Sequence, residues 1–253
     1  MQIVITNDDG WGSKGILTLT RLMLPFGEVT VVAPDSPQSG MSTAISVDKP
    51  ITLSRRTPEQ SDNDIERALL QQAKIYVTNG TPADCVKLAI NALFDGDDRR
   101  IDLLVSGINH GHNASVNIIY SGTMGACLVA AEHRIPTIGF SIDSHLPDAD
   151  LHYFEPYITR LTHDFLNENR LFCYNVNAPI GEIQGIRRTR QAKGHWEKEL
   201  AIHTDTDGNP YYSLIGNFVN HEPQAEDTDM WCLNHGLISV QPVTLDMTDY
   251  TLL

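Results

Sequence analysis

Two aspartates, Asp8 and Asp9, stand side by side where the first apolar run of the chain ends, in residues 3–10 (IVITNDDG). The run is typical of a buried strand, and Gly10 allows the backbone to turn sharply after it. Both carboxylates are therefore expected at the carboxyl end of a strand, where open α/β sheets bind their ligands. Two carboxylates ~5 Å apart repel each other by about 3 kcal/mol at an effective dielectric constant of ~20. The pair indicates that a cation binds between them.

Three further loops are expected at the same edge of the sheet. Residues 35–40 (DSPQSG) follow the second apolar run and offer hydroxyl groups, and residues 106–113 (SGINHGHN) follow a later run. Residues 120–123 (YSGT) open a helix, whose free amides and positive dipole end suit a phosphate. Two carboxylates, a hydroxyl and an amide oxygen form the all-oxygen ligand set of a hard cation, Mg²⁺ or Mn²⁺.

An alternative interpretation starts from the glycines of the same first loop. Gly10, Gly12 and Gly15 fit the Gly-x-Gly-x-x-Gly pattern after a strand, and Asp35 follows about 20 residues later, as a ribose-binding acid would. The chain would then be a non-hydrolytic dinucleotide-binding module. Such a loop holds a pyrophosphate at a helix N-terminus. Asp8 and Asp9 immediately precede the loop and would repel that pyrophosphate, so the carboxylate pair argues against this alternative.

The elements that must position these residues alternate between apolar strands and helices. Strands are expected at residues 3–6, 29–33, 74–78, 101–105, 137–141 and 171–176, and helices at residues 15–24, 82–94, 123–133 and 151–169. Residues 54–72 are polar and predict a surface loop that runs into a short helix from Ile65. This order predicts an α/β fold, a Rossmann-like, doubly wound and mostly parallel sheet.

The last quarter of the chain departs from this alternation. From Gly185 onward the helical pattern stops, strand-like stretches surround a turn at residues 207–209, and a late strand is expected at residues 237–241. We therefore expect two domains. Residues 1–183 form the Rossmann-like catalytic domain, and residues 184–253 form a β-rich C-terminal extension that pairs with another subunit.

Composition limits the class of partner. The chain has 32 acidic and 18 basic residues, a net charge of −14, which argues against long nucleic acid as a partner. No stretch approaches the roughly 18 apolar residues of a membrane span, and the N-terminus begins a strand instead of a signal peptide. The four widely spaced cysteines are expected to be reduced core thiols of a cytoplasmic protein: Cys85, Cys127, Cys173 and Cys232.

Several short motifs occur together in a fixed order. They are residues 7–10 (NDDG), 34–35 (PD) with 39–40 (SG), 80–82 (GTP) with 84–86 (DCV), 106–109 (SGIN) with Gly111 and Asn113, and 120–123 (YSGT). In these motifs the chain resembles the SurE family of survival-protein nucleotidases, which are metal-dependent phosphatases. The resemblance covers about residues 1–143 and resumes more weakly in the tail.

The resemblance implies a ligand set and a substrate class. The implied ligands of a divalent cation are Asp8, Asp9, Ser39 and Asn109. The implied reaction releases phosphate from nucleoside 5′- or 3′-monophosphates, and short polyphosphate is a further candidate substrate. Members of the family form dimers or tetramers whose C-terminal extensions exchange between subunits, so a homodimer or homotetramer is expected. The preferred base, the physiological metal and the choice between the two assemblies stay open.

A mechanism follows as a hypothesis from the oxygen ligands. The cation polarises a phosphoryl oxygen and activates a bound water for in-line attack. Asp8 or Asp9 orients or deprotonates that water, and an aspartyl-phosphate intermediate stays open as a variant. Three side chains, Asn113, Ser121 and Thr123, either donate hydrogen bonds to the phosphoryl oxygens or serve as helix caps. His110 and His112 occupy variable positions of a glycine-rich loop and are expected to be exposed.

Overall fold

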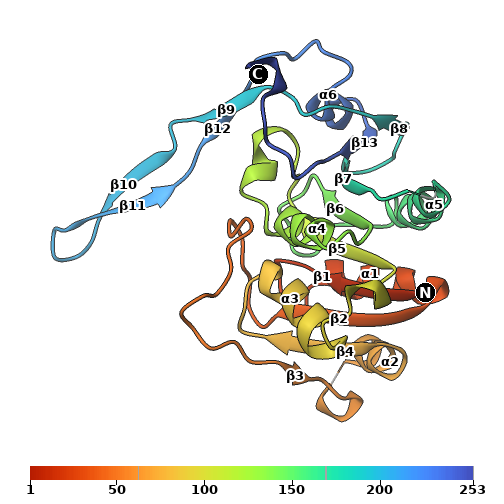
Figure 1. Cartoon of the computed structure of the whole chain (residues 1–253). Coiled ribbons are helices and arrows are strands. Elements are labelled where there is room, and N and C mark those ends of the chain that lie inside the picture. Colours follow the sequence, from red (N-terminus) through yellow and green to blue (C-terminus); the bar gives the residue numbers. More distant parts are fainter. Residues whose placement is uncertain (62, 169, 253) are drawn as a thin grey trace.

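The computed structural model describes residues 1–61, 63–168 and 170–252, and its centre is a nine-stranded sheet in the order β3-β4-β2-β1-β5-β6-β7-β13-β8 (Figure 1). Neighbouring strands are parallel except at the β3–β4 and β7–β13 pairs. The strands are β1 (Gln2–Thr6), β2 (Glu28–Pro34), β3 (Ser54–Arg55), β4 (Lys74–Thr78), β5 (Leu103–His110), β6 (Thr137–Ile142), β7 (Cys173–Ala178), β8 (Gly185–Arg188) and β13 (Leu237–Pro242). The expected doubly wound, mostly parallel α/β sheet is confirmed.

Helices cover both faces of this sheet because its strands are apolar on both faces. One core packs Ile3 and Ile5 of β1 against α1, α2 and α5, and the other packs Val4 of the same strand against α3 and α4. The helices are α1 (Lys14–Met23), α2 (Asp64–Gln72), α3 (Pro82–Leu88), α4 (Gly122–Glu132), α5 (Glu155–Leu166) and α6 (Asp229–Asn234). Helix α4 is buried along most of its length, since small and apolar residues surround its axis.

The C-terminal segment contributes two strands to the central sheet, and another part of it projects away from that sheet. β8 and β13 lie at one end of the central sheet, so strands from both sides of residue 183 share it. Between them two antiparallel ladders form a projecting arm (Figure 1): β9 (Gly194–Glu197) with β12 (Asn217–Asn220), and β10 (Leu200–Thr204) with β11 (Pro210–Leu214). The boundary at residues 183 and 184 stays a prediction. Helix α6 was not expected, because six residues are too few to establish a helical period.

Several element bounds differ from the expected ones for local reasons. β5 continues to His110 instead of ending at residue 105, because a register shift between Ser106 and Asn109 keeps it paired with β6. The α-helical part of residues 82–94 ends at Leu88, and one π-helical turn follows. The helix expected at residues 151–169 begins at Glu155, with a proline in its first turn, and its expected last residue lies outside the described residues.

The four cysteines are free and buried, which confirms the expected core thiols. Burial raises the pKa of Cys173 to about 11, so this thiol stays protonated near neutral pH. Among the described residues, no helix combines the length and apolar character needed to cross a membrane.

Candidate active site

Asp8 is a buried carboxylate held against the start of α4. Its side chain follows β1, and the Thr123 hydroxyl donates to Asp8 Oδ1 at 2.6 Å. A Cβ added to Gly122 would lie 2.8 Å from Asp8 Cβ, so the first turn of α4 can approach this closely only without a side chain there. Burial, and to a smaller extent the charge of Asp9, raises the pKa of Asp8 to about 6. The fold thus holds a carboxylate where its charge is unfavourable without a cation.

Asp9 has a different partner. The backbone N–H of His110 donates to Asp9 Oδ2 at 3.2 Å, and Nδ1 of the same histidine lies 3.1 Å from that oxygen. The His110 side chain is 9% exposed and that of His112 is 16% exposed, so the expectation that both are exposed is wrong. The expectation failed because β5 continues through His110 and carries the imidazole to the carboxylate pair.

The other two predicted ligands lie in segments that are hydrogen-bonded to this pair. The backbone N–H of Gln38 donates to the carbonyl oxygen of Asp8 at 2.7 Å, which places the exposed turn of Ser39 next to β1. Asn109 precedes His110, and its Nδ2 donates to the Gly111 carbonyl at 2.7 Å. Because that bond uses the amide nitrogen, the predicted ligating atom of Asn109 is its amide oxygen.

The loop after Ser39 is fastened by the N-termini of two helices. At α4, the carbonyl of Tyr120 accepts from the backbone N–H of Ser42, and Gly125 lies so close that an added Cβ would meet Ser42 O at 2.0 Å. At α3, the Thr81 hydroxyl donates to the carbonyl of Ala44 at 2.6 Å. The motif at residues 80–82 therefore positions the loop that carries Ser39.

The three predicted substrate-binding residues occupy different places. Ser121 caps α4 by accepting from the backbone N–H of Met124 at 3.0 Å, and Thr123 donates to Asp8. Asn113 is buried in an amide network, in which its Nδ2 donates to Ser141 and its backbone N–H donates to Asn177. The structure brings Ser121 and Thr123 beside the carboxylate pair and ties Asn113 to β6 and β7. Contacts of these three residues with substrate stay predictions.

The donor set fits a hard cation. Within residues 1–61, 63–168 and 170–252, no lysine or arginine forms an ion pair with Asp8 or Asp9, and Lys14 instead donates to the carbonyls of residues 148 and 149. No group of three or more His, Cys, Asp or Glu side chains gathers as a metal site in this part of the chain. Two carboxylates without a lysine or arginine partner among the described residues, together with a hydroxyl and an amide oxygen, suit Mg²⁺ or Mn²⁺, which prefer oxygen ligands.

The glycines of the first loop have structural roles that do not require a dinucleotide. Gly10 turns the chain at φ +93°, and Gly15 lets α1 approach β5, since an added Cβ would lie 2.1 Å from Ile108 O. Asp35, the expected ribose ligand, is exposed and accepts a hydrogen bond from the Ser36 hydroxyl. The dinucleotide-binding alternative is not supported.

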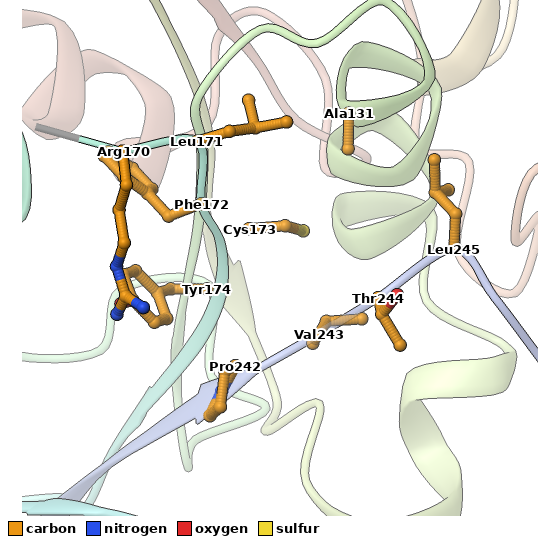
Figure 2. A pocket seen from close by; sticks show the side chains of 10 residues that line it. All are labelled: Ala131, Arg170, Leu171, Phe172, Cys173, Tyr174, Pro242, Val243, Thr244 and Leu245. Atoms are coloured by element: carbon orange, nitrogen blue, oxygen red, sulfur yellow. The ribbon is translucent and has the colours of Figure 1, made fainter.

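A cavity of about 270 Å³ lies away from the carboxylate pair, between the start of β7 and the end of β13 (Figure 2). Phe172, Tyr174 and Val243 line it together with the stem of Arg170. In a parallel sheet the start of β7 and the end of β1 lie at opposite edges. This cavity is therefore separate from the site at Asp8 and Asp9.

Comparison with known proteins identifies the family of this chain. The family model described as "Survival protein SurE" matches residues 3–198. The chain belongs to the SurE family. It is 40% identical to the 5′-nucleotidase SurE of Bacteroides fragilis, over 98% of this chain and 93% of that protein. It is 42% identical to the 5′-nucleotidase SurE of Flavobacterium psychrophilum, over 97% and 92%. The crystal structure of the SurE protein from Aquifex aeolicus covers the whole chain, with a TM-score of 0.80 and 29% identity.

His110 contacts the carboxylate pair but was not among the site residues predicted from the sequence. Its neighbour Asn109 was expected there, and the two share the end of β5. The position of His110 depends on the register shift after Ser106, and no residue pattern predicts such a shift.

Proposed function

We propose that this SurE-family chain is a 5′-nucleotidase, a metal-dependent phosphatase that releases phosphate from nucleoside monophosphates. The observation that carries the proposal is the pair Asp8 and Asp9 at the end of β1, where no lysine or arginine of the described residues forms an ion pair with either carboxylate. The names of the related proteins from Bacteroides and Flavobacterium support the same activity.

The proposed ligands of the divalent cation, Mg²⁺ or Mn²⁺, are Asp8, Asp9, Ser39 and Asn109. When bound, such an ion polarises a phosphoryl oxygen and lowers the pKa of a coordinated water. The buried position of Asp8 supports the assignment, since a desolvated carboxylate gains more from a nearby cation than an exposed one.

The residues of the chain then act on the substrate and the water. Asp8 or Asp9 orients the attacking water and accepts its proton, and the phosphoryl group lies at the N-terminus of α4. There the positive end of the α4 dipole favours the added negative charge, as helix N-termini do toward phosphates. Direct contacts from the side chains of Asn113, Ser121 and Thr123 belong to the same proposal.

Assembly and location are further parts of the proposal. The arm leaves large apolar side chains of β10 and β11 in solvent, which supports a homodimer or homotetramer built through residues 184–253. Four free, buried thiols support a cytoplasmic protein, where thiols stay reduced.

The test is phosphate release from nucleoside 5′- and 3′-monophosphates and from short polyphosphate in the presence of Mg²⁺ or Mn²⁺. The proposal predicts release from a 5′-monophosphate that stops when EDTA is added and returns when excess metal is restored. No release under any of these conditions, or release that EDTA leaves unchanged, would contradict it.

A further inference from the structure

We propose that His110 is a positioning residue that holds Asp9 Oδ2, so that Asp9 Oδ1 is the oxygen presented to the divalent cation. This role rests on the proposed metal-dependent function. It concerns a histidine that lies outside the four predicted ligands. It is carried by three features of the contact between β5 and the loop after β1.

The first feature is that the backbone N–H and the imidazole Nδ1 of His110 both lie at one oxygen of Asp9. The backbone N–H reaches Asp9 Oδ2 at 3.2 Å and Nδ1 reaches it at 3.1 Å. A carboxylate oxygen can only accept, so the contact is favourable in the imidazole form that has its N–H at Nδ1. Asp9 Oδ2 thus accepts the backbone hydrogen bond of His110 and has the imidazole Nδ1 in polar contact, while neither contact involves Oδ1.

The second feature is the surroundings of the imidazole. The side chains of His110 and Asp9 are 9% and 17% exposed, so this contact is shielded from the screening that weakens surface pairs. His110 Nε2 is buried and has no hydrogen-bond partner among the described residues. Within the described part of the chain, the polar contacts of this ring are therefore made with Asp9 alone.

The third feature is that one carboxylate oxygen of each aspartate contacts a polar group from another element. Thr123 holds one oxygen of Asp8 at 2.6 Å, and His110 holds one oxygen of Asp9. Without these donors the like charges would favour rotamers that separate the carboxylates. Donors behind ligating carboxylates fix their orientation and so their affinity for the metal.

The experiment measures Mn²⁺ binding directly, by electron paramagnetic resonance or calorimetry on the metal-free full-length protein. His110→Ala is expected to raise the Kd for Mn²⁺ by about 10- to 100-fold, as loss of an outer-shell donor does. His110→Asn places an amide N–H near the position of Nδ1, and it is expected to restore most of that loss. His112→Ala is the matched control, because His112 lies next to the same strand end and has no described contact with Asp8 or Asp9.

The outcomes separate this role from the function on which it rests. Unchanged Mn²⁺ affinity in His110→Ala, in a protein whose wild type binds Mn²⁺, would overturn the positioning role alone. A loss in His110→Asn as large as in His110→Ala would also overturn it, since packing of the ring and not its polar contact with Asp9 would then matter. A wild-type protein that binds no Mn²⁺ at all would overturn the metal site, and the positioning role with it. Circular dichroism and thermal unfolding of each variant exclude a general loss of fold.

Discussion

At the scale of residues, Asp8 and Asp9 are neighbours in sequence but have different surroundings. Asp8 is 4% exposed and contacts α4 through Thr123 and Gly122, while Asp9 contacts the end of β5 through His110. Each carboxylate therefore contacts a different wall of the site: α4 for Asp8 and the end of β5 for Asp9. A change in either wall is expected to act on the metal through one carboxylate.

Asp9→Asn tests the charge of the pair with little change of shape. The Kd for Mn²⁺ is expected to rise, and kcat/KM for a nucleoside 5′-monophosphate to fall, by at least ~100-fold, the upper end of outer-shell effects. Asp35→Asn on the next loop is the control, since Asp35 is exposed and bonds Ser36. Full activity of Asp9→Asn would remove Asp9 from the site.

Thr123→Val tests the donor to Asp8. The substitution keeps the shape of a fully buried side chain but removes its hydroxyl, so a buried carboxylate loses its hydrogen bond. The free energy of unfolding is expected to fall by about 1–3 kcal/mol in metal-free protein. Urea denaturation measures this loss, and Thr123→Ser should show much less of it. Equal stability of the Val and Ser variants would mean that the bond contributes nothing.

The candidate site was predictable from the sequence where its candidate ligands follow one another in a local pattern. The adjacent pair at residues 8–9 needs only a strand and a glycine turn, and both are visible as patterns. The contact of His110 and the buried amide network of Asn113 were not predictable, because both depend on how β5 continues beside β6. Such register details arise from tertiary packing and not from residue type.

At the scale of elements, the loop between β2 and β3 has no regular structure up to residue 53 and carries Ser39. It is held by α3 through Thr81 and by α4 through the close approach of Gly125 to Ser42. Two helix N-termini thus fix the position of a predicted ligand. Contacts with these two helices hold the irregular loop in position.

Gly125→Ala tests this fastening. Alanine in a helix normally stabilises by about 1 kcal/mol relative to glycine, but here the new Cβ would meet Ser42 O at 2.0 Å. The loop is expected to shift, with a loss of roughly 10-fold in Mn²⁺ affinity, as for an outer-shell change. Calorimetric titration measures this loss.

Gly12→Ala is the control for this loop variant, since nothing lies within 4 Å of the added atom. It should leave metal affinity and activity unchanged. A more stable Gly125→Ala protein with wild-type affinity would show that the loop does not depend on α4.

At the scale of the whole molecule, the arm stands apart from the sheet (Figure 1). In the β10–β11 ladder Leu200 faces Leu214 and Ile202 faces Tyr212, and all four side chains are exposed. They form one apolar face on a two-stranded ribbon, which is not stable alone in water. We therefore expect another subunit to cover the apolar face of the arm in an assembly.

The double variant Ile202→Ser with Leu214→Ser tests the assembly. These side chains are 73% and 85% exposed, so their loss costs the isolated subunit little. Size-exclusion chromatography with light scattering is expected to show a smaller mass than for the wild type at the same concentration. Unchanged mass would place the subunit contact elsewhere.

The large-scale fold was mostly predictable, because apolar runs and helical periods alternate through residue 178. The order of strands at one end of the sheet was not predictable from the sequence. β13 lies between β7 and β8 although it comes much later in the chain, and no local pattern specifies that neighbour. Strand order depends on pairing between strands far apart in the chain, and a single sequence indicates such pairing only weakly.

The most direct test of the metal site is a crystal structure with Mn²⁺ and phosphate, located by the anomalous signal of the metal. The account predicts one ion bound by oxygens of Asp8, Asp9, Ser39 and Asn109, with phosphate at the N-terminus of α4. It also predicts that the ion contacts Asp9 Oδ1 while His110 keeps Asp9 Oδ2. An ion bound away from the Asp8–Asp9 pair, or none at saturating Mn²⁺, would contradict the account.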